Sequence, residues 1–254
     1  MPSDRTRATR ADATSAPRFT PKSLSFLRAL KRNNDREWFR GRKDQYEEHL
    51  KTPMLAVIDQ LAKDFRSFAP ELVATPKGIF RIYRDTRFSE DKTPLKTNIA
   101  ASFPWRGMQR HEGAGLYIEV APGWVWVGGG LYAPQTAQLA AVREHVAGNY
   151  ERLRSIVESP GFKKSVGKLE GAKLQRVPRG FDKSHPAAEY LRHRQFLAFR
   201  EFPGEFAYNA TFYPGVLDVM RRIAPLVRFL NEPLAGTSRA HVAAGLHRPA
   251  GRPG

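Results

Sequence analysis

The sequence contains no cysteine among its 254 residues. This absence excludes disulfide bonds, thiolate nucleophiles, zinc–cysteine sites and iron–sulfur clusters, and it is typical of a reducing compartment. The sequence also lacks the run of about 18 apolar residues that a membrane-spanning helix needs. Its first 18 residues contain no apolar segment of the kind that secretory signals have. We therefore expect a cytoplasmic location and no membrane span.

Acidic residues are few relative to basic ones, with 25 Asp and Glu against 42 Lys and Arg and a net charge of +17. The excess is not confined to the ends, since residues 161–200 hold ten basic side chains against three acidic ones. Such a surface attracts nucleic acid, acidic membranes or phosphorylated small molecules. It is equally compatible with a protein that is merely kept in solution, because net charge governs association rather than fold.

The first third of the chain has apolar residues at helical spacing. The pattern predicts a helix over 20–32, a second one from the N-cap Asp35 and a third one after Pro53. The core-facing stripe predicted for the third helix consists of Leu55, Ile58, Leu61, Ala62 and Phe65.

The middle of the chain is rich in residues that favour strands, and Pro122-Gly123 is a hairpin signal between two of these runs. Four runs predict a mostly antiparallel sheet: 80–83, 96–103, 116–120 and 124–127. A fifth strand is predicted at 196–199. Helices are predicted over 134–159 with a break at Gly148-Asn149, over 187–194, and over about 206–230.

The order of helices, strands and helices predicts a single compact α+β domain. Its four- to five-stranded, mostly antiparallel sheet is expected to pack against N-terminal and C-terminal helices. We place this domain at 19–235, between disordered basic tails at 1–18 and 236–254. The sequence leaves the oligomeric state open.

The stretch FRIYRDTRFSEDKTPLKT, residues 80–97, is unusually rich in charges of both signs. Surface ion pairs contribute only about 0–1 kcal/mol each, so stability alone explains this density poorly. Guanidinium groups are suited to bidentate capture of phosphate or carboxylate. We therefore predict a site for a phosphorylated or carboxylated small molecule, whose binding residues are Arg81, Tyr83, Arg84, Arg87, Lys92 and Lys96.

Two carboxylates of the same stretch are the candidate catalytic residues. Asp85 and Asp91 could hold the arginines in fixed orientations, act as acid or base, or bind a metal ion. No His pair has zinc-binding spacing, so we predict no pre-built metal site, whereas Mg²⁺ arriving with a phosphorylated ligand is an alternative. Whether the site catalyses a reaction is left open.

Nucleic-acid binding by the basic segment 161–200 is the alternative function. Basic side chains alternate there with aromatic ones, as in grooves that bind single strands, although no nucleic-acid-binding motif is present. The residues predicted for this surface are Lys163, Lys164, Lys173, Arg176, Arg179 and Lys183.

The glycine run Gly128-Gly129-Gly130 has two interpretations. Its backbone N–H groups could cradle an anion before the helix predicted from Pro134. The alternative, which we favour, is that small residues allow another backbone segment to approach closely, since the run matches neither common phosphate-binding motif.

Several of these segments together resemble one family. FRIYRDTRFSEDKTPLKT, SFLRALKRNNDREWF, the segment 128–134, and Leu174 with 178–181 and 185–186 are similar to the bacterial and fungal family catalogued as domain of unknown function 2461. The resemblance covers roughly 19–230 and implies no particular activity. The chain departs from the family pattern at Leu95, where an aromatic residue is more common, and at Phe181, where Tyr is.

Overall fold

The computed structural model of the chain describes residues 16–87 and 90–245, and describes side chains as far as residue 235. The helical elements are α1 (Pro21–Arg32), α2 (Arg36–Arg40), α3 (Lys43–Tyr46), a π-helical turn (Glu47–Lys51), α4 (Thr52–Phe68), a 3₁₀ turn (Pro76–Gly78), α5 (Thr136–Gly148), α6 (Tyr150–Val157), α7 (Pro160–Ser165), α8 (Ala188–Leu191), a second 3₁₀ turn (Gly204–Tyr208) and α9 (Phe212–Gly245). The strands are β1 (Ile99–Phe103), β2 (Gly115–Val120), β3 (Trp124–Leu131) and β4 (Phe196–Pro203).

The four strands form one antiparallel sheet in the order β1-β2-β3-β4. A three-residue turn joins β2 to β3, and it is closed by the Ala121 N–H donating to the Trp124 carbonyl over 2.9 Å. This hairpin is the one that Pro122-Gly123 predicts. Together with the helices before and after it, the sheet confirms the predicted α+β fold.

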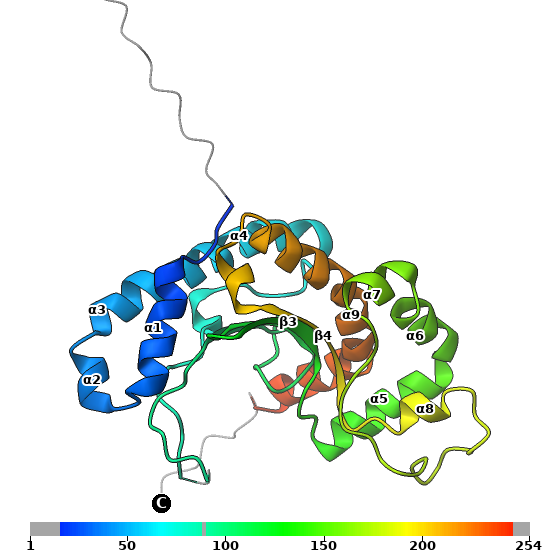
Figure 1. The fold of residues 1–254 in the computed structure, drawn as a ribbon. Coiled ribbons are helices and arrows are strands. Elements are labelled where there is room, and N and C mark those ends of the chain that lie inside the picture. The colour runs from blue at the N-terminus through cyan, green and yellow to red at the C-terminus, as the bar shows by residue number, and fades with distance from the viewer. Residues whose placement is uncertain (1–15, 88–89, 246–254) are drawn as a thin grey trace, which may run out of the picture.

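The two faces of the sheet have different environments. Along β3, Val125 and Val127 are buried, whereas Trp124 and Trp126 between them are exposed. The buried face lies in the hydrophobic core with α9, which contacts β2, β3 and β4. Figure 1 shows α1–α3 on one side and α5–α8 on the other, with α4 above the arched sheet. The opposite face of β3 therefore remains open to solvent.

The N-terminal helices begin where the sequence predicts. The Asp35 carboxylate accepts hydrogen bonds from the backbone N–H groups of Glu37 (2.7 Å) and Trp38 (2.9 Å), which caps α2. These bonds, chiefly the one from Trp38, lower the pKa of Asp35 because they stabilise its ionised form.

The buried stripe of α4 is displaced by one position from the predicted one. Met54 and Val57 are fully buried, whereas Leu55 and Ala62 are only half-buried. The predicted residues Ile58, Leu61 and Phe65 do lie in the core. A stripe on a helix spans neighbouring positions, so its exact edge depends on what packs against it.

The segment 80–83, predicted as the first strand, is not a strand of this sheet. It runs beside the residues around β1 through a few hydrogen bonds, from the Phe80 N–H to Ala100 O (2.9 Å) and from the Lys96 N–H to Ile82 O (2.8 Å). Pro94 has no N–H to donate, so a regular ladder cannot continue there. The fourth strand is instead β4, the segment predicted at 196–199 and now extended to Pro203.

The later helices differ from the predictions mainly in length. The predicted helix over 134–159 is divided at Asn149 into α5 and α6, as its break signal indicates. The short helix α7 follows α6 and contains the first residues of the basic segment 161–200. The last helix, α9, starts at Phe212 rather than near 206 and continues ten residues beyond 235. No described helix, α9 included, is both long and apolar enough to cross a membrane.

Candidate functional site

We call residues 84–93 the charged loop. The loop lies below the sheet, at the lower left of Figure 1. Phe88 and Ser89 of the predicted motif lie outside the described residues. The Arg84 guanidinium pairs with the Asp91 carboxylate at 2.5 Å, and Arg87 pairs with Asp85 at 2.8 Å. The Lys92 ammonium donates to the Thr86 carbonyl over 3.0 Å. Two ion pairs therefore compensate four charges of this loop, whereas the acceptor of Lys92 is neutral.

The two candidate catalytic carboxylates are stabilised in their ionised form. Hydrogen bonds from Arg87 lower the pKa of Asp85 to about 2. The pKa of Asp91 is lowered chiefly by hydrogen bonds from Thr93, and also by the charge of Arg84. Both carboxylates thus orient arginines. The described residues contain no group of three or more His, Asp or Glu side chains placed to hold a metal ion, so binding of Mg²⁺ with a ligand stays a prediction.

The remaining predicted binding residues flank the charged loop. Arg81 and Tyr83 are both exposed, and Ile82 between them is buried, so the two share a face as predicted. The Tyr83 ring packs edge-on against Phe39 at 6.0 Å. Lys96 is half-buried. It forms no ion pair with a carboxylate of the described residues, although the charge of Arg84, which does form one, acts on it.

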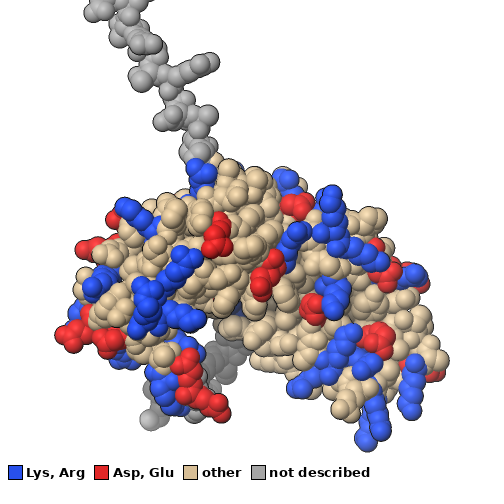
Figure 2. Space-filling view, in the orientation of Figure 1, with Lys and Arg blue, Asp and Glu red and all other residues tan. Residues whose placement is uncertain are grey.

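A hollow of about 480 Å³ occupies the open face of the sheet, and we call it the aromatic hollow. Its wall includes Phe80, Tyr117, Trp126 and Phe199, and the Trp126 and Phe199 rings lie 5.5 Å apart at 33°. Figure 2 shows the molecule hollowed beneath the sheet, beside the charged loop. Exposed apolar patches of this kind mark binding sites. Four of the five large hydrophobic side chains exposed in the described residues lie on or beside this face: Trp124, Trp126, Tyr132 and Phe199.

Two cations lie over the ring of Phe80, which lines the aromatic hollow, and one of them, Arg110, lines the hollow as well. The Lys96 nitrogen is 5.1 Å, and the Arg110 guanidinium carbon 4.1 Å, from the ring centroid. Arg110 donates to the carbonyls of Lys77 (2.8 Å) and Gly78 (3.1 Å), which are neutral. Within residues 16–87 and 90–235, neither cation forms an ion pair with a carboxylate. Their positive charge is therefore available to a ligand.

The electrostatics of Lys96 reflect this excess of positive charge. Burial is the largest cause that lowers the pKa of Lys96, followed by the charges of Arg81, Arg110 and Arg84. The charge of Glu119 acts in the opposite direction and raises this pKa. Burial also lowers the pKa of Arg110. A bound anion would relieve the repulsion within this cluster.

A buried carboxylate lies at the inner wall of the aromatic hollow. Glu119 is 8% exposed and accepts hydrogen bonds from the Tyr117 hydroxyl (2.6 Å) and the Trp124 indole N–H (3.2 Å). Burial, followed by the bond to Glu119, raises the pKa of Tyr117. The Trp126 indole N–H donates to Glu201. These bonds fix the orientation of the rings, which favours stacking against a flat ligand.

The glycine run Gly128–Gly130 forms part of β3 and lines the aromatic hollow. A Cβ atom on Gly128 would lie 2.6 Å from the Phe199 Cβ, and one on Gly130 would lie 2.0 Å from the Phe196 carbonyl oxygen. Gly130 also has a φ of +125°, which L side chains rarely adopt. The run thus allows close approach of β4, which is the interpretation favoured in the sequence analysis.

The basic segment 161–200 presents its cations to solvent, and Figure 2 shows Lys and Arg side chains projecting at the lower right. The exposed residues include all six predicted ones: Lys163, Lys164, Lys173, Arg176, Arg179 and Lys183. The neighbouring rings do not form a platform, since Phe162 and Phe196 are fully buried and Phe181 and Tyr190 half-buried. Nucleic-acid binding by this segment stays a prediction.

Sequence reasoning missed five residues of the aromatic hollow: Arg110, Tyr117, Glu119, Trp126 and Phe199. The alternation of valines with tryptophans at 124–127 could have shown that two indoles share the face opposite the core. The same alternation places Tyr117 and Glu119 together on β2. No local pattern indicates Arg110, which comes from an irregular segment.

The departure from the family pattern at Leu95 lies in the core. Leu95 is fully buried, and its backbone is held by Asn34, whose side chain donates to the Leu95 carbonyl (2.9 Å) and accepts from its N–H (3.0 Å). Leucine in place of an aromatic residue at position 95 therefore changes the packing of the core rather than a surface contact. Phe181, the other departure, is half-buried.

Comparisons with known proteins agree with the resemblance described above. The search of curated proteins found no match. Residues 22–229 match the family described as "Conserved hypothetical protein (DUF2461)". Because this match spans most of the chain and includes the charged loop and every strand of the sheet, the protein belongs to the DUF2461 family.

Proposed function

We propose that this protein binds a small anionic ligand that also carries a flat ring, in the aromatic hollow. The observation that carries the proposal is the position of Lys96 and Arg110, two cations without carboxylate partners in the described residues, at a hollow walled by aromatic rings. A positive cluster beside an exposed apolar surface costs free energy unless a ligand neutralises and covers it.

The two halves of the ligand would have separate partners. The phosphate or carboxylate would approach Lys96 and Arg110, where charge-assisted hydrogen bonds are about twice as strong as neutral ones. The ring would stack on Trp126 and Phe199, whose rings are already in contact at 5.5 Å. The Glu119 carboxylate could accept hydrogen bonds from donor groups of the ring. A nucleoside phosphate combines these features and is therefore a suitable first probe.

Calorimetric titration of the full chain tests the proposal. The panel contains nucleoside monophosphates, sugar phosphates and aromatic carboxylates, with and without Mg²⁺. We expect binding only by anions that carry a ring, and a loss of at least tenfold in affinity in Lys96→Ala. At 100 times its dissociation constant, the ligand should stabilise the fold by about 2.7 kcal/mol.

Lys63→Ala provides a matched control, because Lys63 is exposed on α4 and the substitution removes the same charge. Equal affinity of Lys96→Ala and Lys63→Ala for every probe would refute the proposal. Oligonucleotide binding that is unaffected by Lys96→Ala but lost on substitution of Lys173 and Arg176 would instead assign the function to the basic segment.

A further inference from the structure

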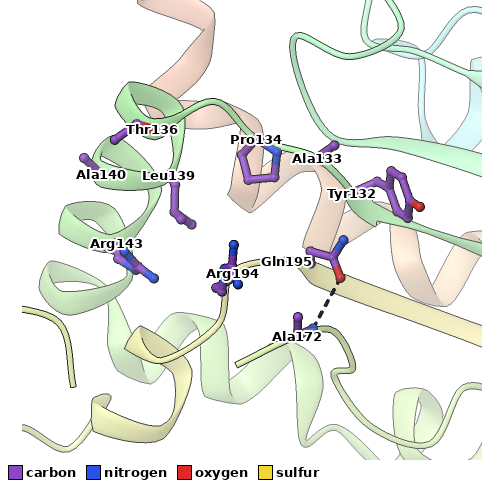
Figure 3. A pocket seen from close by; sticks show the side chains of 10 residues that line it. All are labelled: Tyr132, Ala133, Pro134, Thr136, Leu139, Ala140, Arg143, Ala172, Arg194 and Gln195. Carbon is purple, nitrogen blue, oxygen red and sulfur yellow. Dashed lines mark hydrogen bonds between the residues drawn. The ribbon is translucent and has the colours of Figure 1, made fainter. Parts of the chain in front are cut away.

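A second hollow, of about 550 Å³, meets the aromatic hollow at Tyr132 and Ala133, which line both. It lies between the first half of α5 and the residues just before β4. Figure 3 shows Arg143 of α5 and Arg194 of the latter segment pointing into the space between these elements. We call it the arginine hollow. Neither Asp nor Glu is among the residues that line it.

Arg143 is held in a fixed orientation that leaves its charge uncompensated. Its Nε donates to the Leu191 carbonyl over 2.9 Å, and one Nη donates to the His193 carbonyl over 3.0 Å. Both acceptors are neutral, and no described carboxylate forms an ion pair with Arg143. A guanidinium that is already oriented loses less conformational freedom when it binds an oxyanion.

Arg194 supplies a second positive charge at the same place. It is exposed, and its side chain makes no hydrogen bond or ion pair within residues 16–87 and 90–235. Burial is the main cause that lowers the pKa of Arg143, and the charge of Arg194 lowers it further, so the two cations are close. Thr136, the first residue of the 13-residue helix α5, also lines the hollow. The helix dipole adds positive potential there.

We propose that the arginine hollow is a second anion site, which binds a phosphate or pyrophosphate group of a small molecule. Arg143 is the pre-oriented donor, and Arg194 is the mobile one that closes on the bound oxyanion. The proposal is independent of the ligand in the aromatic hollow. Since the two hollows meet at Tyr132, a ligand with two phosphate groups would be able to occupy both.

The test uses inorganic pyrophosphate and the side-chain N–H resonances of the arginines in the full chain. The Arg143 Nε–H signal, held by its bond to Leu191, is assigned by its absence in Arg143→Lys. We expect a saturable shift of this signal on titration in a low-salt buffer without phosphate. The affinity should fall at least tenfold in Arg194→Ala and remain unchanged in Arg176→Ala, which removes an exposed charge from the basic segment.

Three results would overturn the inference: no saturable shift, an unchanged affinity in Arg194→Ala, or an equal loss in Arg176→Ala. Arg194→Ala removes no hydrogen bond within the described residues, so we expect it to fold, and its thermal unfolding should match that of the wild type. Lys96→Ala should leave the Arg143 shift unchanged. A shift that survives Lys96→Ala while nucleotide binding is absent would separate this site from the proposed function.

Discussion

The stretch of sequence 80–97 supplies Arg84 and Arg87 to the charged loop and Lys96 to the ring of Phe80 at the aromatic hollow, and these cations have different surroundings. In the loop, Arg84 and Arg87 face Asp91 and Asp85, and each pair is exposed. At the hollow, Lys96 lies over an aromatic ring and has positive neighbours. A dense run of charges in the sequence thus contains cations in two different environments, some with carboxylate partners and one without.

Charge reversal at the two regions should give the largest difference. We expect Lys96→Glu to weaken binding of a nucleoside monophosphate by about 100-fold, since it loses a charge-assisted hydrogen bond and places a carboxylate beside the anion. Lys92→Glu is the matched charge reversal in the charged loop, and it should weaken this binding only a few-fold. Calorimetric titration measures both. Equal losses would show that the loop belongs to the site, as the sequence predicted.

Removal of an exposed aromatic ring should also affect ligand binding differently at the aromatic hollow and at the charged loop. Trp126→Ala should lower the affinity about tenfold or more, because stacking of one base on an aromatic side chain contributes about 1–3 kcal/mol. Tyr83→Ala removes a ring beside the charged loop that is even more exposed than Trp126 and should change the affinity less than twofold. An effect of Tyr83→Ala as large as that of Trp126→Ala would extend the ligand towards α2.

The pH dependence of binding should report on Lys96 itself. Because burial and nearby arginines lower the pKa of Lys96, the ammonium loses its proton at a lower pH than an ordinary lysine. The affinity for a monophosphate should therefore fall as the pH rises towards this pKa. Lys96→Arg, which stays charged, should remove the fall. An identical pH profile in Lys96→Arg would show that another group causes it.

Breaking an ion pair of the charged loop should have a small effect on stability. Arg84 and Asp91 are partly exposed to solvent, and pairs of this kind contribute about 0–1 kcal/mol. Urea denaturation of Arg84→Ala should therefore show a loss of less than about 1 kcal/mol. A loss of several times this value would mean that the loop holds the sheet and the N-terminal helices together.

The smallest expected effect is a change in the pKa of one carboxyl group, that of Asp85. Arg87→Ala should raise the pKa of Asp85 from about 2 towards its ordinary value, as carboxyl ¹³C shifts would show. In the wild type the pair favours the folded state above the ordinary pKa of Asp, about 3.9, and this preference disappears as the pH falls towards 2. An unchanged pKa in Arg87→Ala would mean that other groups stabilise the Asp85 carboxylate.

Local signals predicted most of the fold. Asp35 caps its helix, Pro122-Gly123 closes the hairpin, and Asn149 divides the helical region that follows. The errors arose where long-range pairing overrides local preference. Residues 80–83 have the alternation of a strand, but Pro94 interrupts their partner, and β4, which begins 65 positions after the end of β3, completes the sheet. A pattern of neighbouring residues cannot predict that β3 pairs with β4.

By itself, the sequence determined the class of fold, the position of the charged stretch and the alternation that gives each strand two different faces. These properties depend on neighbours in the chain and on the periods of helices and strands. Only the tertiary structure decided which cations have a carboxylate partner and which do not. Arg110 reaches Phe80 across 30 positions, and Arg143 lines the same hollow as Arg194 across 51. Electrostatic partnership depends on distance in space, which the fold sets and the order of residues does not.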